Sequence, residues 1–140
     1  MKEYISKQQQ IRQPIEAIYM ALSRFDNLTP ALKDRVEEWQ ADEQSCSFKA
    51  KGFNVKLRME ERVENKHVKI VGDGGIPIDF ALWVQLHKVD TYDTRLRIVL
   101  HIELNMMMKM MIGSKLQEAV DQVAENLAKG FNGELQYPTN

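Results

Sequence analysis

Few side chains in this sequence have the type and spacing that catalysis requires, and Glu61 is the clearest candidate. Counting by two along the alternating strand that begins at Phe53 places Glu61 on the same face as the large apolar residues. A carboxylate at the rim of an apolar cavity would have a raised pKa and could orient a polar ligand head or act as acid or base. A bulge at residues 60–61 would instead turn Glu61 outward, as a solvated strand end. Both alternatives stay open.

The histidines, the cysteine and the glycine-rich loop indicate no catalytic or metal site. His87 and His101 share the outward face of two paired strands but lie several residue pairs apart, and His67 is next to a turn. No metal and no cofactor are therefore expected. Cys46 alternates with polar residues, as a small buried hydrophobe in a strand does. Residues 72–75 (Gly-Asp-Gly-Gly) lack the Lys-Ser/Thr and the following helix of a phosphate loop, so a turn is expected.

Five of the eight methionines fall in the first turns of one amphipathic helix that is expected to span Asn105–Phe131. They are Met106, Met107, Met108, Met110 and Met111. Methionine is flexible and polarizable and fills irregular apolar space. Because one side of a helix recurs about every 3.6 residues, only Met108 and Met111 are expected to point inward. They predict either the lining of an adaptable cavity or a soft core.

Hydrophobic periodicity predicts the elements of the N-terminal part. A polar extended segment over Glu3–Arg12 is followed by a short helix over Ile15–Leu22. A second short helix is expected over Leu28–Asp34, with Thr29 as its N-cap. Residues 36–40 are ambiguous between a helix tail and an edge strand.

From Ser45 to Glu103 the period is two, which predicts a long series of antiparallel strands. The last two fit a hairpin in which Val89 lies opposite Arg95 and Val84 opposite Leu100, with the large apolar residues on one side. Long strands with one apolar face tend to curve, and only the C-terminal helix is long enough to fill the concave side. Its expected apolar stripe is Met108, Ile112, Leu116, Val120, Val123 and Leu127.

Several segments match one known superfamily. They are Pro14 to Tyr19 with Leu22-Ser23, Cys46 to Phe48 with Gly52, Phe80 to Leu86, Thr94-Arg95, Glu103 to Met111, Lys115 to Glu118, and Leu127-Ala128. The chain thereby resembles the helix-grip fold of the START-like or Bet v 1-like (SRPBCC) superfamily, in particular its small single-domain bacterial polyketide-cyclase-like members. The resemblance implies one α+β domain over residues 1–140, with a curved antiparallel sheet of six or seven strands wrapped around a long C-terminal helix. It also implies two short helices after the first strand, a seventh strand at residues 36–40, and an apolar ligand cavity.

The expected function is binding of a small apolar or amphipathic ligand, lipid-like or polyketide-like, between the sheet and the C-terminal helix. Apolar walls would supply affinity, and a few polar groups would fix orientation. The residues expected to contact the ligand are Phe53, Val55, Leu57, Glu61, Phe80, Leu82, Val84, Leu100, Ile102, Met108, Met111 and Ile112. One alternative is an enzyme of cyclase or dehydratase type that uses an inward acid such as Glu61. The other is an interaction module with a filled core and no ligand.

Composition and charge complete the expectations. A chain of 140 residues, 44% of them apolar and 28% charged, is expected to form a single domain with a core. Lys and Arg number 19 and Asp and Glu 20, so nucleic acid is not an expected partner. The polar N-terminus, the single cysteine and the lack of a run of about 20 apolar residues predict cytoplasmic location without stable membrane insertion. A monomer or weak homodimer is expected.

Overall fold

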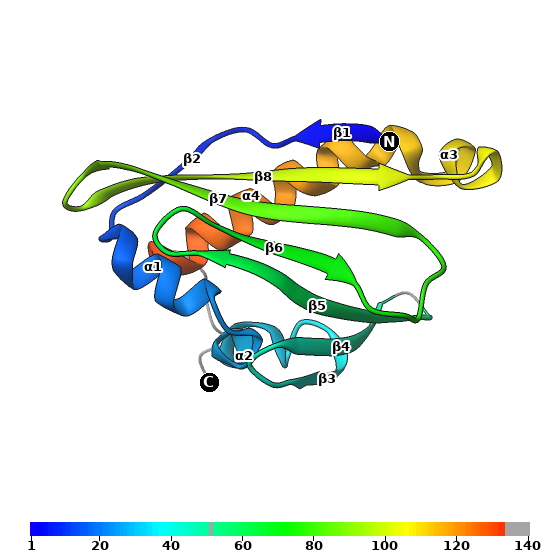
Figure 1. Ribbon diagram of the computed structural model, residues 1–140, viewed down its shortest axis with the longest axis horizontal. Helices are drawn as coiled ribbons and strands as arrows, with labels where there is room; N and C mark the ends of the chain where they lie inside the picture. Colours follow the sequence, from blue (N-terminus) through cyan, green and yellow to red (C-terminus); the bar gives the residue numbers. More distant parts are fainter. Residues whose placement is uncertain (51, 134–140) are drawn as a thin grey trace.

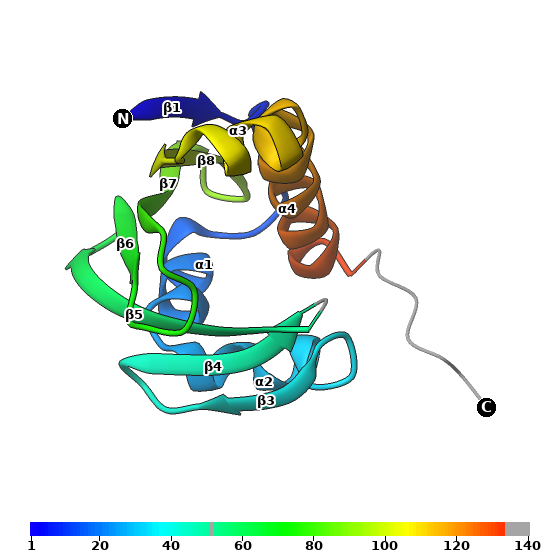
Figure 2. The ribbon, with the colours of Figure 1, turned by 90° about the vertical axis from the view of Figure 1, so that its right-hand side faces the viewer.

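The computed structural model describes residues 1–50 and 52–133, and the strands in this part of the chain form one curved antiparallel sheet. The strands are β1 Lys2–Ile5, β2 Gln9–Ile11, β3 Glu37–Ala41, β4 Ser45–Ala50, β5 Phe53–Val63, β6 His67–Gly72, β7 Asp79–Asp90 and β8 Asp93–Glu103. Their order across the sheet is β1-β8-β7-β6-β5-β4-β3, and β2 also pairs with β8. Figures 1 and 2 show the sheet curving from β1 round to β3.

Helical segments lie near both ends of the described chain. They are α1 Ile15–Leu22, the 3-10 turn η1 Phe25–Leu28, α2 Thr29–Leu32, α3 Met106–Ile112, the 3-10 turn η2 Gly113–Lys115 and α4 Leu116–Phe131. Ile15, Ile18 and Leu22 form the buried face of α1, as their spacing predicts. In Figure 2, α4 stands on the concave side of the sheet. The predicted α+β helix-grip architecture is confirmed.

The predicted extended segment at the N-terminus is divided into β1 and β2 by Ser6. The Ser6 side chain is buried, and its Oγ accepts a 2.8 Å hydrogen bond from the backbone N–H of Ile98 in β8. The Ser6 N–H in turn donates to the Ile98 carbonyl at 2.8 Å. A side-chain oxygen thus replaces one backbone acceptor of the ladder, and both halves of the segment still pair with the same neighbouring strand.

The ambiguous residues 36–40 belong to β3, the edge strand expected from the resemblance. Its pairing with β4 shifts between Glu37 and Gln40, and Glu38 has a φ of 56°, so the edge is bulged. The expected N-cap role of Thr29 is wrong. The Thr29 Oγ1 instead accepts a 2.9 Å hydrogen bond from the Trp39 indole, which ties α2 to β3.

The C-terminal helical segment is interrupted, where one continuous helix was expected. Asn105 caps α3 by accepting a hydrogen bond from the Met108 N–H at 2.8 Å, but the α-helix stops at Ile112 and passes through η2 before α4 begins. Gly113 begins this 3-10 turn. Figure 1 shows α3 beyond the end of β8, with α4 running back behind the sheet. The apolar faces of α3 and α4 are therefore not one stripe.

The predicted pairing of β7 with β8 is wrong by two residues, although the faces are right. Val84 lies opposite Ile98 and Leu82 opposite Leu100, whereas Val84 was expected opposite Leu100. The hairpin turn is tighter than expected, because Asp90 already pairs with Asp93. A slip of two residues keeps every side chain on its original face, since side chains alternate with a period of two.

Small side chains allow α4 to pack closely on the sheet. Val120, Ala124 and Ala128 are buried where α4 meets β1, β2 and β8. The expected stripe placed Val123 in this contact, but Val123 is 47% exposed. The helix is thus rotated relative to the expectation, and a second apolar row that includes Val123 faces away from β8.

Candidate functional site

The concave face of the sheet carries large apolar side chains in register across five strands. One such row runs through Met59 (β5), Ile70 (β6), Leu82 (β7), Leu100 (β8) and Tyr4 (β1). Met59, Leu100 and Tyr4 are buried, whereas Ile70 and Leu82 are only half-buried. The middle of the concave face is therefore apolar but incompletely covered by the rest of the protein.

Gly72 gives the ring of Phe80 its place on this face. A Cβ atom built on Gly72 would lie 2.9 Å from Cε1 of Phe80, closer than carbon atoms approach. Gly72 pairs with Leu57 on β5, so the ring covers the position where a side chain of β6 is absent. Phe80 and Leu57 are both half-buried and belong to the same apolar surface.

The residues expected to contact a ligand separate into three groups by exposure. Val84, Leu100 and Ile102 are buried. The half-buried group is Val55, Leu57, Phe80, Leu82, Met108 and Ile112. Phe53, Met111 and Glu61 are exposed, contrary to the expected inward orientation. Phe53 is the first residue of β5, at the end of the sheet. Met111 lies on α3, which is separated from the packed part of α4 by the turn at Gly113.

Most of the methionine cluster lies at the surface. Met106, Met107, Met110 and Met111 are between 66% and 81% exposed, and α3 contains no buried residue. Met108 alone of the five is half-buried. The expected inward pair is thus reduced to Met108, because α3 projects beyond the end of the sheet (Figure 1).

Glu61 is turned outward by the bulge that the sequence left open. The pairing of β5 with β6 shifts between Met59 and Glu61, and Glu61 lies 3.2 Å from Nε2 of His67 at the surface. The bulge changes which residues follow on the inner face. Arg62 lies opposite the buried Val68, so a guanidinium occupies the inner-face position beyond Met59.

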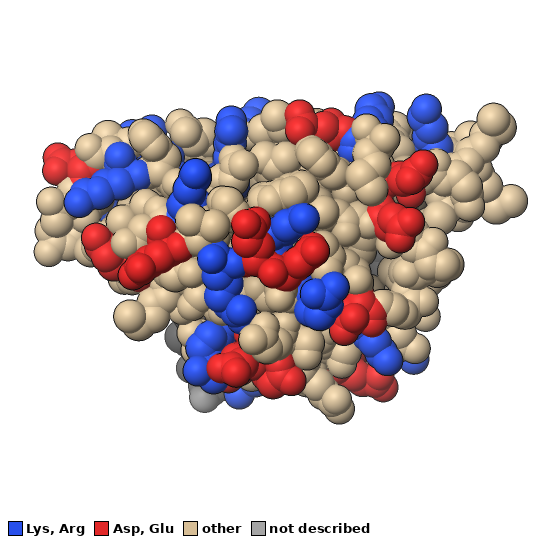
Figure 3. Space-filling model, in the orientation of Figure 1, with Lys and Arg blue, Asp and Glu red and all other residues tan. Residues whose placement is uncertain are grey.

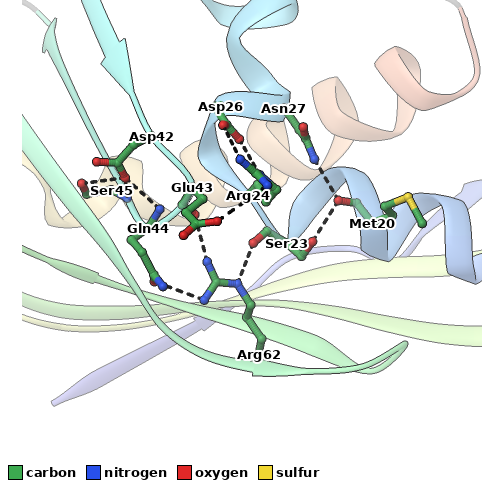
Figure 4. Close-up of polar contacts among 10 residues, drawn as sticks. All are labelled: Met20, Ser23, Arg24, Asp26, Asn27, Asp42, Glu43, Gln44, Ser45 and Arg62. Atoms are coloured by element: carbon green, nitrogen blue, oxygen red, sulfur yellow. Dashed lines mark hydrogen bonds and ion pairs between the residues drawn. The ribbon is translucent and has the colours of Figure 1, made fainter.

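Arg62 joins three separate segments at this end of the sheet (Figure 4). Its Nε donates to the Ser23 carbonyl at 2.6 Å, and its Nη2 donates to the Glu43 carbonyl at 2.9 Å. Its Nη1 donates to Oε1 of Gln44 at 3.2 Å. Ser23 is the C-cap of α1, where carbonyl groups lack helical partners and a cation is favourable. Sequence analysis missed Arg62, because its inward orientation depends on the bulge.

The turn between β3 and β4 is stabilised from within. Oδ1 of Asp42 accepts hydrogen bonds from the N–H groups of Gln44 and Ser45, both at 2.8 Å. These backbone hydrogen bonds, that of Ser45 first, lower the pKa of the Asp42 carboxyl. In the same region Arg24 makes a bidentate pair with Asp26, and the hydrogen bond from Arg24 lowers the pKa of Asp26. Figure 4 shows these groups around Arg62.

A largely apolar pocket of about 300 Å³ lies between α1–α2 and the C-terminal half of α4. It is lined by Ala21, Asn27, Leu28, Leu32, Arg35, Val123, Asn126, Leu127, Gly130 and Phe131. Leu28, Leu127 and Phe131 also pack against the core beneath the concave face. The second apolar row of α4 thus forms one wall, and the η1–α2 region forms the other. Sequence analysis did not find this pocket, because its two walls come from opposite ends of the chain.

Nucleophilic and metal chemistry find little support in the described residues. Burial raises the pKa of the Cys46 thiol to about 12, so the reactive thiolate is disfavoured. In residues 1–50 and 52–133, no group of three His, Cys, Asp or Glu side chains is placed to share a metal ion. Over the same ranges, no helix has the length and apolar character needed to cross a membrane. Figure 3 shows basic and acidic side chains interspersed over the visible face.

Comparison with solved structures places this fold among START-like and Bet v 1-like proteins. The Aha1 dimer from Colwellia psychrerythraea is 17% identical, with a TM-score of 0.69 over 97% of this chain and 100% of that one. Norcoclaurine synthase from Thalictrum flavum, in complex with dopamine and hydroxybenzaldehyde, is 8% identical, with a TM-score of 0.74 over 97% of this chain and 89% of that one. A START superfamily protein from Mycobacterium smegmatis is 14% identical, with a TM-score of 0.59 over 89% and 98%.

At these identities the likeness shows the fold alone, and the family is shown by sequence. No curated protein matches the sequence significantly. The model of the carbon monoxide dehydrogenase CoxG family matches residues 8–136, from just before β2 through the whole of α4. The chain therefore belongs to the CoxG family of carbon monoxide dehydrogenase proteins.

Proposed function

We propose that this protein binds a small apolar or amphipathic molecule between its curved sheet and α4. The pocket of about 300 Å³ between α2 and α4 is the observation that carries the proposal. Its volume is at the lower end of the range for small-molecule sites, and most of its lining is aliphatic or aromatic. The fold adds support, because START-like and Bet v 1-like proteins commonly bind hydrophobic ligands.

Binding would be driven by removing apolar surface from water. The pocket supplies Leu32 from one wall and Val123 and Phe131 from the other. Each methylene group that enters should contribute about 0.8 kcal/mol, which is roughly fourfold in affinity. The half-buried side chains of the concave face, such as Leu82, offer further apolar surface next to the same core.

Catalysis has less support than binding. Glu61, the acid considered from the sequence, lies outward beside His67. Among the described residues that line the pocket, none is acidic and none is a histidine. An acid–base mechanism would need at least one such group within hydrogen-bond reach of the substrate.

The proposal is tested with a series of straight-chain alcohols, titrated calorimetrically against the protein. Affinity should rise about fourfold per added methylene and level off when the pocket is full. Val123→Trp should weaken binding at least tenfold, because the indole would occupy the pocket from a side chain that is already 47% exposed. Val89→Trp is the matched control, since Val89 is exposed on the β7–β8 hairpin. Absence of saturable binding, or equal binding by both variants, would contradict the proposal.

A further inference from the structure

Arg35 is the charged side chain among the described residues that line the α2–α4 pocket. It is exposed, and no ion pair joins it to an acidic residue within residues 1–50 and 52–133. Other guanidiniums near this end of the molecule are engaged, such as Arg24 with Asp26. Arg35 therefore places a positive charge beside an apolar cavity without a neutralising partner.

The neutral polar groups of the pocket add hydrogen-bond donors to this charge. Asn27 and Asn126 lie on opposite walls. The Asn126 carbonyl oxygen accepts a hydrogen bond from Gln122 at 3.1 Å, which leaves the Asn126 amide N–H groups to donate. The Asn27 amide donates to the Met20 carbonyl at 3.0 Å. The pocket thus presents aliphatic walls, one cation and an amide donor, without a carboxylate in the described lining.

We propose that the pocket selects amphiphiles with an anionic carboxylate head, which binds Arg35 while the tail lies against Leu32, Leu127 and Phe131. The inference rests on the proposed function, because it names the ligand class of the same pocket. A planar guanidinium matches a carboxylate with two parallel hydrogen bonds, which a hydroxyl head cannot accept in the same way. The apolar tail supplies most of the affinity, and Arg35 supplies the preference between heads.

The experiment compares decanoate with decanol, both below their aggregation limits, by calorimetric titration of the full chain. The carboxylate should bind about tenfold more tightly than the alcohol at low salt. Arg35→Gln should remove this difference and leave decanol affinity unchanged, and Arg35→Lys should restore part of it. Lys33→Gln is the matched control, because Lys33 is an exposed cation next to α2 that does not line the pocket. The preference should shrink as salt increases, since the charge lies near solvent.

The outcomes separate this inference from the proposed function. Equal affinity for decanoate and decanol, or a preference that survives Arg35→Gln, would overturn the carboxylate assignment and leave apolar binding intact. An Arg35→Gln variant that weakens both ligands equally would also overturn it, because Arg35 would then shape the pocket rather than recognise the head. Absence of binding by either ligand would reject the inference and the proposed function together.

Discussion

Arg62 donates a 2.6 Å hydrogen bond from Nε to the carbonyl oxygen of Ser23, the residue that ends α1. The same guanidinium reaches the turn between β3 and β4, so one side chain of β5 connects a helix end to a hairpin. Both connected segments flank the elements that form one wall of the pocket. The bulge in β5 makes this possible, because it exchanges Glu61 for Arg62 on the inner face.

Arg62→Ala should lower the free energy of unfolding by about 1–3 kcal/mol, because three acceptors lose a charged donor. Urea denaturation followed by circular dichroism measures the change. Arg58→Ala is the control, since Arg58 is an exposed residue of the same strand and should change stability by less than about 0.5 kcal/mol. Equal losses for the two variants would show that the Arg62 hydrogen bonds are not stabilising.

Gly72→Ala should destabilise the protein by about 1–3 kcal/mol, because its methyl group would lie 2.9 Å from Cε1 of Phe80. Phe80→Leu removes the ring that causes this clash. The double variant should therefore lose less stability than the sum of the two single variants, and thermal melts of all four proteins measure the coupling. Additive losses would mean that Phe80 does not pack over Gly72.

Leu100→Asp should prevent cooperative folding. Leu100 is buried in the row between Leu82 and Tyr4, and an unpaired carboxylate there should cost several kcal/mol, comparable to the whole stability of a small domain. Val89→Asp, at an exposed position of the same hairpin, should fold normally. Amide dispersion in a proton–nitrogen correlation spectrum distinguishes folded from unfolded protein. A folded Leu100→Asp variant would contradict the inner-face assignment.

Cys46 should react slowly with iodoacetamide in the native protein and rapidly once the protein is unfolded. With its pKa raised to about 12 by burial, only about one thiol in ten thousand is ionised at pH 8. The folded state therefore favours the neutral thiol, and mass spectrometry of samples quenched over time measures the protection. Equal rates in native buffer and in urea would show that the thiol is accessible.

The faces of the strands and the class of fold could be predicted, because alternation of apolar residues survives whatever the strands pair with. The pairing of β7 with β8 could not, since a slip of two residues leaves every face unchanged. The orientations of Glu61 and Arg62 depend on one extra residue in β5, and alternation alone does not reveal where a bulge occurs.

The candidate site was predicted less well than the fold. The concave-face residues Leu57, Phe80 and Leu82 were named correctly as inward and apolar. Exposed Met111 was not, because the helix is interrupted at Gly113. The α2–α4 pocket depends on how α4 is rotated against the sheet, and this rotation follows from the close packing of Ala124 and Ala128. Such tertiary packing is not encoded in the local pattern.

The central claim, that an apolar ligand lies between α2 and α4, is tested most directly by intermolecular nuclear Overhauser effects. Protein with labelled leucine and valine methyl groups is mixed with an unlabelled straight-chain ligand. The account predicts effects from the ligand chain to the methyl groups of Leu32, Val123 and Leu127, which line the pocket. Effects confined to Val99, which pairs with Trp83 on the opposite face of the sheet, would contradict it, as would the absence of any effect at saturating ligand.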